Sequence, residues 1–498
     1  MSTISVTNLT FCYEGSYHPV FENLSLSLDT SWHLDLTGRN GRGKTTLVRL
    51  LLGSQNHPFG LHAASGSVHA PLPLSYFPAP ISCPDQPALE AAQSLCPQRP
   101  EWKLLRELSL LEFPEDALWR PYSQLSGGEQ TKLQLAALFV QEGGFPLLDE
   151  PTNHLDAHSR QLVANYLRRQ SGFLLISHDR AFLDGCVDHI LALNRTGPEL
   201  RRGDFSGWYA DYLSRTQSQR EQNTRLRREI SRLEQSARRT ADWSDRVEAS
   251  KIGQGGCDRG AVGHKAAKMM KRSKAIQARQ LQAAEQKKKL LHDVENIGEL
   301  RLAPLSHFSS RLIQARDLSI CLDSQPLFAP VTFSLEQGER LCLSGNNGCG
   351  KTSLLRLICG EALPHTGLLE TASGLRLSLV EQDTSGLCGS LADYLERCGA
   401  DLTLCLSILR NLGFERSQFE LPMEQYSQGQ KKKVLIARSL CQQAHLYLWD
   451  EPLNYLDLFS RIQLEQLLTA SPVTLLFVEH DQQFCKAVAT NTVHLHRL

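Results

Sequence analysis

The chain has 498 residues and a formal net charge of zero, with 53 basic and 53 acidic side chains. Hydrophobic residues make up 41% and charged residues 21%, close to the globular average, which excludes a disordered, collagen-like or disulfide-scaffold protein. At roughly 150 residues per domain, the length predicts about three folding units. The 14 cysteines form no Cys-x-x-Cys pair, no stretch is apolar for long enough to cross a bilayer, and the N-terminus lacks an export signal. We therefore expect a cytoplasmic protein with reduced thiols.

A phosphate-binding loop is predicted near the N-terminus. Residues 38–45 match the pattern G-x-x-x-x-G-K-[ST] and stand between a predicted strand at 33–37 and a predicted helix from Thr45. In such a loop, glycines let backbone N–H groups surround the phosphates, Lys44 reaches the β- and γ-phosphates, and the Thr45 hydroxyl serves Mg²⁺. The predicted nucleotide ligands are Gly38, Arg39, Asn40, Gly41, Arg42, Gly43, Lys44, Thr45 and Thr46.

Polar residues after two further predicted strands extend this site. The apolar strand at 145–149 ends in Asp149 and Glu150, and His178 follows the apolar run 172–177. Buried strands rarely end in two unpaired acids for packing reasons. We therefore expect Asp149 near the metal, Glu150 polarising the attacking water, and His178 within reach of the γ-phosphate.

The second half of the chain repeats these blocks in the same order. Residues 345–352 again match the phosphate-loop pattern, 307 residues after the first loop, while Asp450 with Glu451 recurs after 301 residues and His480 after 302. A Ser-Gly-Gly-Glu block at 126–129 recurs as Ser-Gln-Gly-Gln at 427–430. Four collinear repeats predict two copies of one nucleotide-binding domain. The predicted ligands are Gly345, Asn346, Asn347, Gly348, Cys349, Gly350, Lys351, Thr352, Ser353, Ser126, Gly127, Gly128, Glu129, Ser427, Gln428, Gly429 and Gln430.

These residues, in this order, resemble the ATP-binding-cassette family, from roughly 1–215 and 305–498, and the block at 126–129 resembles the family's signature. The resemblance implies an α/β fold in which two tandem cassettes stack head to tail, with ATP and Mg²⁺ between the P-loop of one and the signature of the other. Site one would combine Gly38–Thr45, Asp149, Glu150 and His178 with Ser427–Gln430. Site two would combine Gly345–Thr352, Gln382, Asp450, Glu451 and His480 with Ser126–Glu129, and the metal residues would be Thr45, Asp149, Thr352, Gln382 and Asp450.

Several positions depart from the cassette pattern. Ala79 stands where the family usually has the glutamine that links the metal to domain motion, whereas Gln382 supplies it in the second half. Tyr13 is the aromatic residue expected to stack on adenine, and the matching place at 320–323 has none. The second signature has Gln428 for glycine and Gln430 for glutamate. The two sites are therefore chemically unequal, and the sequence leaves open which one paces hydrolysis.

The segment between the two halves concentrates positive charge. Residues 215–289 contain 20 basic and 8 acidic side chains, a net charge of +12 that the rest of the chain offsets. Residues 217–249 have a heptad-like seam at Leu226, Ile230, Leu233 and Ala237, and 264–296 again reads as helix with Ala283, Leu290 and Val294 on one stripe. Five glycines lie within 252–263. This pattern predicts an antiparallel helical hairpin with a flexible tip, whose arms of roughly 35 residues reach on the order of 50 Å.

The basic residues of this hairpin predict contacts with RNA. A strut that only spaces two domains is the alternative, but like charges at helical spacing repel each other and a polyanion would offset that repulsion. Phosphate contacts position a protein regardless of sequence, and recognition by shape suits ribosomal RNA. The predicted contact residues are Lys251, Arg259, Lys265, Lys268, Lys271, Arg272, Lys274 and Arg279.

Two fused cassettes with a long charged linker and no membrane domain resemble the ABC-F group, and residues 243–247, 263–274 and 446–457 resemble its Lsa-type antibiotic-resistance members. The resemblance implies a monomeric ATPase that binds the bacterial ribosome, through large-subunit rRNA and tRNA. It would protect the ribosome from lincosamides, streptogramin A and pleuromutilins by inserting its linker near the tRNA and peptidyl-transferase site, and ATP hydrolysis would release it. A housekeeping factor that rescues stalled ribosomes and the ATPase subunit of a membrane transporter remain alternatives. We expect the first cassette at residues 1–214, the linker at 215–300 and the second cassette at 301–498.

Overall fold

The computed structural model describes residues 2–497 apart from the gaps 14–18, 56–59, 64, 142, 154, 195–196, 250–258, 290–301, 303, 323–324, 347 and 415. The chain forms two compact units, one made of Met1–Ser206 with Gly298–Leu498 and the other of Gly207–Ile297. The first unit contains both nucleotide-binding halves, and the second contains the segment between them. The boundaries expected at 214/215 and 300/301 stay predictions.

The first half is built on a six-stranded sheet in the order β5-β6-β7-β3-β8-β9. All neighbours in this sheet are parallel except β8 and β9. An antiparallel sheet, β2-β1-β4, forms a second layer. The strands are β1 Thr3–Phe11, β2 Phe21–Asp29, β3 His33–Thr37, β4 Ser65–His69, β5 Leu74–Phe77, β6 Phe145–Asp149, β7 Phe173–Ile176, β8 His189–Asn194 and β9 Gly197–Arg202, and the main helices are α1 Lys44–Gly53, α2 Ala88–Leu95, α3 Glu101–Leu110, α4 Gly127–Phe139, α5 Ala157–Leu167 and α6 Arg180–Cys186.

The second half repeats this plan. Its parallel sheet has the order β15-β16-β17-β13-β18, and β10 pairs antiparallel with β11, β12 and β14. The strands are β10 Arg311–Leu322, β11 Gln325–Pro326, β12 Val331–Glu336, β13 Arg340–Gly345, β14 His365–Thr371, β15 Leu377–Val380, β16 Leu446–Asp450, β17 Leu475–Val478 and β18 Asn491–Leu495, and the helices are α9 Lys351–Ile358, α10 Leu391–Arg397, α11 Leu402–Asn411, α12 Gln428–Cys441, α13 Leu458–Ala470 and α14 Gln482–Val488.

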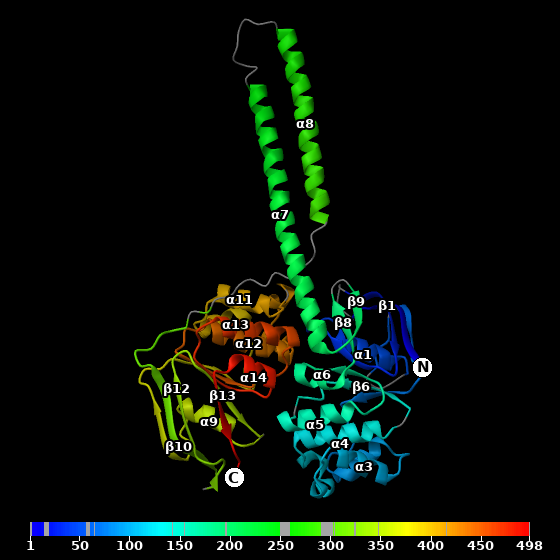
Figure 1. Cartoon of the computed structure of the whole chain (residues 1–498), viewed down its shortest axis with the longest axis vertical. Coiled ribbons are helices and arrows are strands. Elements are labelled where there is room, and N and C mark those ends of the chain that lie inside the picture. Colours follow the sequence, from blue (N-terminus) through cyan, green and yellow to red (C-terminus); the bar gives the residue numbers. More distant parts are fainter. Residues whose placement is uncertain are drawn as a thin grey trace. The chain divides into compact units, whose positions relative to one another are not determined.

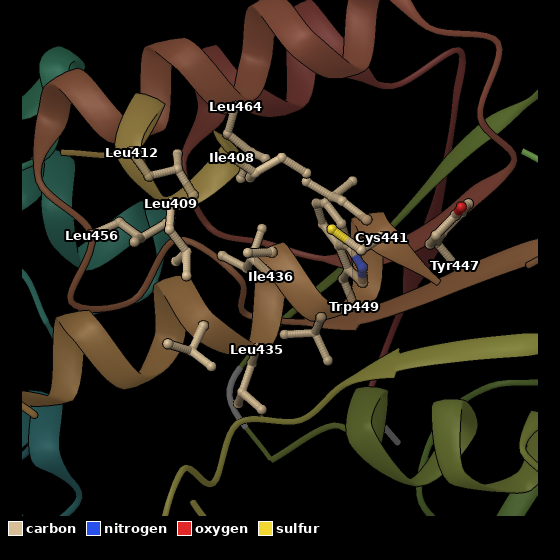
Figure 2. Close-up of a cluster of buried hydrophobic side chains, with 14 of the residues drawn as sticks. Ile408, Leu409, Leu412, Leu435, Ile436, Cys441, Tyr447, Trp449, Leu456 and Leu464 are labelled. Atoms are coloured by element: carbon tan, nitrogen blue, oxygen red, sulfur yellow. The ribbon is translucent and has the colours of Figure 1, made fainter. Parts of the chain in front are cut away.

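Strand β16 shows why its neighbourhood is apolar on both faces. Tyr447 and Trp449 point into a core with the helices α11, α12 and α13 (Figure 2), whereas Leu446 and Leu448 enter a second core with α9 and the antiparallel strands. Successive residues of a strand point to opposite faces, so both sets are covered. Asp450 ends this strand, as Asp149 ends β6. Because the neighbouring strands are parallel, their carboxyl ends lie at one edge of each sheet, as the motif positions require.

Two long helices, α7 Phe205–Ala249 and α8 Arg259–Lys289, form the segment between the halves (Figure 1). Gln280 Nε2 donates to Ser236 Oγ over 2.9 Å, Lys288 lies 2.7 Å from Glu234, and Lys287 pairs with Glu229. Higher numbers on α8 meet lower numbers on α7, so the helices are antiparallel. The predicted hairpin and the α/β fold class are confirmed. No helix within the described ranges is both long and apolar enough to cross a membrane.

The hairpin differs from its prediction in register and length. Ile230 and Ala237 are buried as expected, but from Lys271 to Lys288, the part of α8 whose side chains are described, the buried residues are Ser273 and Ala284, and Ala283 is only half-buried. Polar groups also meet in this seam, as in the hydrogen bond from Gln280 to Ser236. Helix α7 begins 12 residues before the expected position 217, and α8 begins at 259 instead of 264, through two glycines. Leu290, Val294 and residues 252–258 of the predicted tip lie outside the described residues.

Candidate nucleotide sites

Both P-loops have the conformation that phosphate binding needs. Gly43 and Gly350, directly before α1 and α9, have φ values of 86° and 96°, a left-handed region that favours glycine. A Cβ on Gly43 would also lie 2.6 Å from Val20 Cγ1. Lys44 Nζ donates to Gly38 O over 2.6 Å and Lys351 Nζ donates to Gly345 O over 2.7 Å. Each lysine therefore lies over its own loop, beside the N–H groups at the start of a helix.

The acids at the ends of β6 and β16 stand beside the P-loop threonines. Burial raises the pKa of Asp149 and of Asp450, and hydrogen bonds with Thr45 and Thr352, respectively, oppose that rise. Asp450 Oδ1 is buried and has no hydrogen-bond partner. A carboxylate beside a hydroxyl is the oxygen donor set that Mg²⁺ prefers, and an orphaned buried oxygen is what a cation would satisfy. These residues therefore fit Mg²⁺.

In site one, Glu150 and His178 form a close pair. His178 Nε2 lies 3.0 Å from Glu150 Oε1. Burial, with help from the charge of Asp149, raises the pKa of Glu150 to about 8, and burial holds the pKa of His178 well below its usual value. Burial therefore favours the uncharged form of both groups. Glu150 has a φ of 54°, a left-handed conformation that costs a non-glycine residue about 1–3 kcal/mol.

In site two, the corresponding Glu451 is held differently. Its Oε2 accepts hydrogen bonds from Gln382 Nε2 over 2.7 Å and from Asn454 Nδ2 over 2.6 Å, and His480 Nε2 lies 3.6 Å from its Oε1. Burial alone would raise the pKa of Glu451, but His480 and Asn454 hold it below its usual value. The pKa of Glu451 is therefore lowered, whereas that of Glu150 is raised. Gln382, expected near the metal, contacts this glutamate in the structure.

Both signature serines open helices. Ser126 Oγ accepts from Glu129 N over 3.3 Å, and Glu129 Oε2 accepts from Ser126 N over 2.8 Å. Ser427 and Gln430 make the same reciprocal pair before α12, with distances of 3.3 Å and 2.8 Å. An amide oxygen accepts a hydrogen bond as a carboxylate does, so the glutamine at 430 preserves the helix start. The other departure, Gln428, accepts from Thr384 Oγ1 over 3.0 Å.

The first P-loop meets the second signature. Asn40 Nδ2 donates to Tyr455 O over 3.4 Å, and a Cβ on Gly429 would lie 3.2 Å from the same Nδ2 and 2.4 Å from Tyr455 O. This is the pairing expected for site one, and it leaves no room for a side chain at 429. Within the part of the chain that the structure describes, no hydrogen bond or ion pair joins Ser126–Glu129 to the second P-loop. The composition of site two stays a prediction.

The other predicted ligands lie in the same loops and first helical turns. Tyr13 is 43% exposed, and its hydroxyl lies 2.8 Å from Thr46 Oγ1, so its ring is held beside α1. Asn347 lies outside the described residues. The remaining predicted ligands are Gly38, Arg39, Gly41, Arg42, Gly127, Gly128, Asn346, Gly348, Cys349 and Ser353.

Three residues of these sites were missed in the sequence. Tyr76 Oη donates to Asp149 Oδ2 over 3.2 Å, and Lys432 Nζ donates to Glu381 O over 2.8 Å and Asp450 O over 3.1 Å. Lys432 is 1% exposed, and burial lowers its pKa to about 8. It stands in a run of three lysines, which gives no sign of burial. Asn454 could have been found, because Asn153 stands at the same distance after Glu150.

The hairpin exposes basic side chains on both of its helices. On α8, the side chains of Lys271, Arg272, Lys274 and Arg279 are exposed. Arg259, Lys265 and Lys268 lie on the same helix, and Lys251 lies outside the described residues. On α7, three arginines that were not singled out in the sequence lie on one exposed face of the helix, Arg227, Arg228 and Arg232.

The family comparison decides the class of protein. The sequence model described as ABC transporter matches residues 21–153 and 328–454, which include both P-loops, both signatures and both acidic pairs. The chain belongs to the ABC transporter family. With two cassettes and a helical pair between them, it is a twin-cassette ATP-binding protein of the ABC-F type. Its cassettes bind ATP and imply ATPase activity.

Similar proteins match over nearly the whole chain. The ribosome protection protein VmlR of Bacillus subtilis (strain 168) is 27% identical over 97% of this chain and 84% of its own length. The ATP-binding protein Uup of Caulobacter vibrioides is 27% identical over 96% of this chain and 75% of its own length. The solved structure of the archaeal ribosome recycling factor aABCE1, in complex with the stalk protein aP1, aligns with a TM-score of 0.62 at 17% identity, over 98% of this chain and 87% of that one. That likeness shows the fold alone.

Proposed function

We propose that this protein binds the bacterial ribosome in an ATP-bound, closed form and protects it from antibiotics that act at the peptidyl-transferase site. The drug classes would be lincosamides, streptogramin A and pleuromutilins, as in the Lsa-type group. The hairpin of α7 and α8 would enter near the tRNA and the peptidyl-transferase site, and ATP hydrolysis would release the protein. It would act in the cytoplasm as a monomer whose two cassettes pair with each other.

One observation carries this proposal: the similarity to a ribosome protection protein extends over 97% of the chain and so includes the hairpin. The exposed cations on α8, from Lys271 to Arg279, supply a physical reason for an RNA partner. Like charges one helical turn apart destabilise an isolated helix, and phosphates of RNA would neutralise them. Such contacts position a protein on a fixed RNA shape without reading its sequence.

The proposed ATP cycle assigns a role to each group of site residues. The P-loop lysines and the N–H groups that follow them would bind the phosphates. Mg²⁺, when bound, would offset phosphate charge, and the pairs Thr45 with Asp149 and Thr352 with Asp450 would hold it. His178 and His480 would contact the γ-phosphate. Glu451, and Glu150 in its ionised form, would accept a proton from the attacking water.

Sedimentation with ribosomes and drug susceptibility test the proposal together. With a non-hydrolysable ATP analogue, the protein should pellet with bacterial 70S ribosomes, and without nucleotide it should stay in the supernatant. Expression in a sensitive host should raise the inhibitory concentration of a lincosamide or a pleuromutilin several-fold. Ribosome binding without any change in susceptibility would favour a housekeeping factor that rescues stalled ribosomes. Co-purification with membranes, without ribosome binding, would contradict the proposal.

Neutralising the exposed cations of α8 should weaken ribosome binding. In a variant with Lys271, Arg272, Lys274 and Arg279 all changed to glutamine, we expect the affinity to fall by 10-fold or more at about 100 mM salt. The dependence of log affinity on log salt should become shallower by about 0.7–0.9 for each phosphate that the variant no longer neutralises. ATP hydrolysis in the absence of ribosomes should not change, because these side chains lie on the hairpin.

The matched control changes four exposed arginines of the first cassette, Arg106, Arg168, Arg169 and Arg202, to glutamine. It removes the same charge from a surface for which no RNA contact is proposed. An equal loss of affinity and an equal change of slope in the two variants would show that net charge, and not the hairpin, governs binding.

A further inference from the structure

The two sites hold their acidic pairs with different residues from equivalent strands. In the first cassette, Tyr76 pairs in register with Leu147 of β6, two residues before Asp149. In the second, Leu379 pairs with Leu448 of β16, two residues before Asp450. Tyr76 and Leu379 therefore occupy the same place beside the same end of the sheet. Site one therefore has a hydroxyl group, that of Tyr76, at the place where site two has the apolar side chain of Leu379.

At the position of Gln382, the second cassette has the hydrogen-bond donor and the first cassette lacks it. Gln382 follows β15 by two residues and donates to Glu451 Oε2 over 2.7 Å. Ala79 follows β5 by two residues and has no side chain that could do the same. Site one has instead the bond from Tyr76 Oη to Asp149 Oδ2, over 3.2 Å. Each cassette thus directs one donor from the same strand end to its acidic pair.

The Tyr76 donor stands on a segment that is tied to the signature helix. The backbone N–H of Ala79, three residues further on, donates to Gln134 Oε1 over 3.0 Å. Gln134 is 8% exposed, belongs to α4, and donates in turn to Tyr122 Oη over 2.7 Å. Ser126 opens that same helix. A continuous path of two hydrogen bonds and one short segment therefore runs from Asp149 to the helix that carries the first signature.

The second cassette makes the corresponding tie with another residue. Lys432 of α12 donates to the backbone oxygens of Glu381 and Asp450. Its counterpart on α4, Thr131, donates to Gly127 O within its own helix instead. In both cassettes, a buried polar side chain of the signature helix thus holds the segment after the strand.

We propose that Tyr76 is the positioning residue of Asp149 in site one, in place of the missing glutamine, and that Gln134 links it to the first signature helix. The inference rests on the proposed metal role of Asp149 and not on the ribosome as a partner. Removal of the hydroxyl leaves Asp149 free to turn away from Thr45, so that metal and nucleotide bind more weakly. The signature helix then loses its connection to that site.

Manganese binding tests the first step directly. In a parent protein with Glu150 and Glu451 changed to glutamine, Mn²⁺ binding with saturating ATP is measured by electron paramagnetic resonance. Two bound Mn²⁺ ions in the parent establish the metal sites before any further change. Tyr76→Phe should then lower the affinity for one of the two Mn²⁺ ions by about 10-fold, the effect of losing one hydrogen bond to a charged group. The affinity for the other ion should not change. Two ions of unchanged affinity would overturn the proposal.

The matched control is Tyr166→Phe. Tyr166 Oη donates to Glu107 Oε2 over 2.9 Å, so this variant removes the same kind of hydroxyl–carboxylate bond from the same cassette, away from the P-loop. Manganese affinity should not change in this variant. Equal weakening by Tyr166→Phe would reduce Tyr76 to a merely structural role.

Gln134→Leu tests the second step, since leucine is the residue at this place in the second cassette, Leu435. Manganese affinity should stay within 2-fold of the parent, because Tyr76 and Asp149 are untouched. The amount of ATP retained by the closed parent protein after rapid gel filtration should fall from two molecules toward one. Retention of two molecules would contradict the link to the signature helix.

Discussion

Changing both Glu150 and Glu451 to glutamine should lower ATP turnover by about 100-fold or more, the usual contribution of a general base, while ATP binding persists. Glutamine keeps the shape of the side chain and its acceptor oxygen but cannot take a proton from water. Phosphate release measures turnover, and binding of a fluorescent ATP analogue measures retention. On ribosomes, the same variant should stay in the pellet with ATP itself, because release requires hydrolysis.

The two single variants should be unequal. Glu451 is ionised and is held by Gln382 and Asn454, whereas burial raises the pKa of Glu150 to about 8. A carboxyl group with a raised pKa is less often in the ionised form that accepts a proton, so at pH 7 site two should carry most of the turnover. Glu451→Gln should therefore remove the larger share, and Glu150→Gln the smaller. The exposed Glu115→Gln serves as the control for removal of one acid. A larger effect of Glu150→Gln, or free sedimentation of the double variant in ATP, would contradict the assignment.

Much of this architecture could be read from the sequence because its signals are local or repeated. The strands at 145–149 and 446–450 are short apolar runs that end in acids, and the structure places β6 and β16 at those residues. The constant spacing between the repeated motifs was enough to align the sequences of the two halves before their sheets were known. The hairpin followed from charge and apolar spacing, although the seam of α8 proved to contain Ser273.

What could not be predicted depends on contacts between distant segments. Tyr76 reads as an ordinary strand residue until β5 pairs with β6 and brings its hydroxyl to Asp149. Lys432 reads as a surface cation until α12 packs against the sheet and buries it against two backbone oxygens. The unequal ionisation of Glu150 and Glu451 has the same origin, because burial and neighbouring donors, not the motif, set the two pKa values.

Removing the carboxyl group of Asp35 should stabilise the first cassette. Asp35 lies in the middle of β3, is 0% exposed, and neither of its oxygens has a hydrogen-bond partner. The same place in the second cassette holds Cys342, since Asp35 pairs with Leu175 and Cys342 with Phe477 on equivalent strands. An unsatisfied buried polar group costs roughly 1–3 kcal/mol, and each kcal/mol is about 2–4 °C in a domain of this size. Calorimetry of Asp35→Cys should show a higher unfolding temperature for the first cassette, with the second cassette as internal reference.

The pH dependence separates the charge of Asp35 from its polarity. Burial raises the pKa of Asp35 well above its usual value, with the charge of Lys44 opposing that rise. The unfolded chain therefore releases this proton at a lower pH than the folded chain does, and the folded state loses stability as pH rises between the two pKa values. Asp35→Asn keeps a polar group but cannot ionise, so its advantage over the unaltered protein should grow from pH 5.5 to pH 8.5. Asp35→Cys should be more stable throughout that range, because it removes both the buried carboxylate charge and the buried polar oxygens that have no hydrogen-bond partner. A difference that is constant with pH, or an asparagine variant less stable at pH 8.5, would show that Asp35 is neither protonated nor destabilising in the folded cassette.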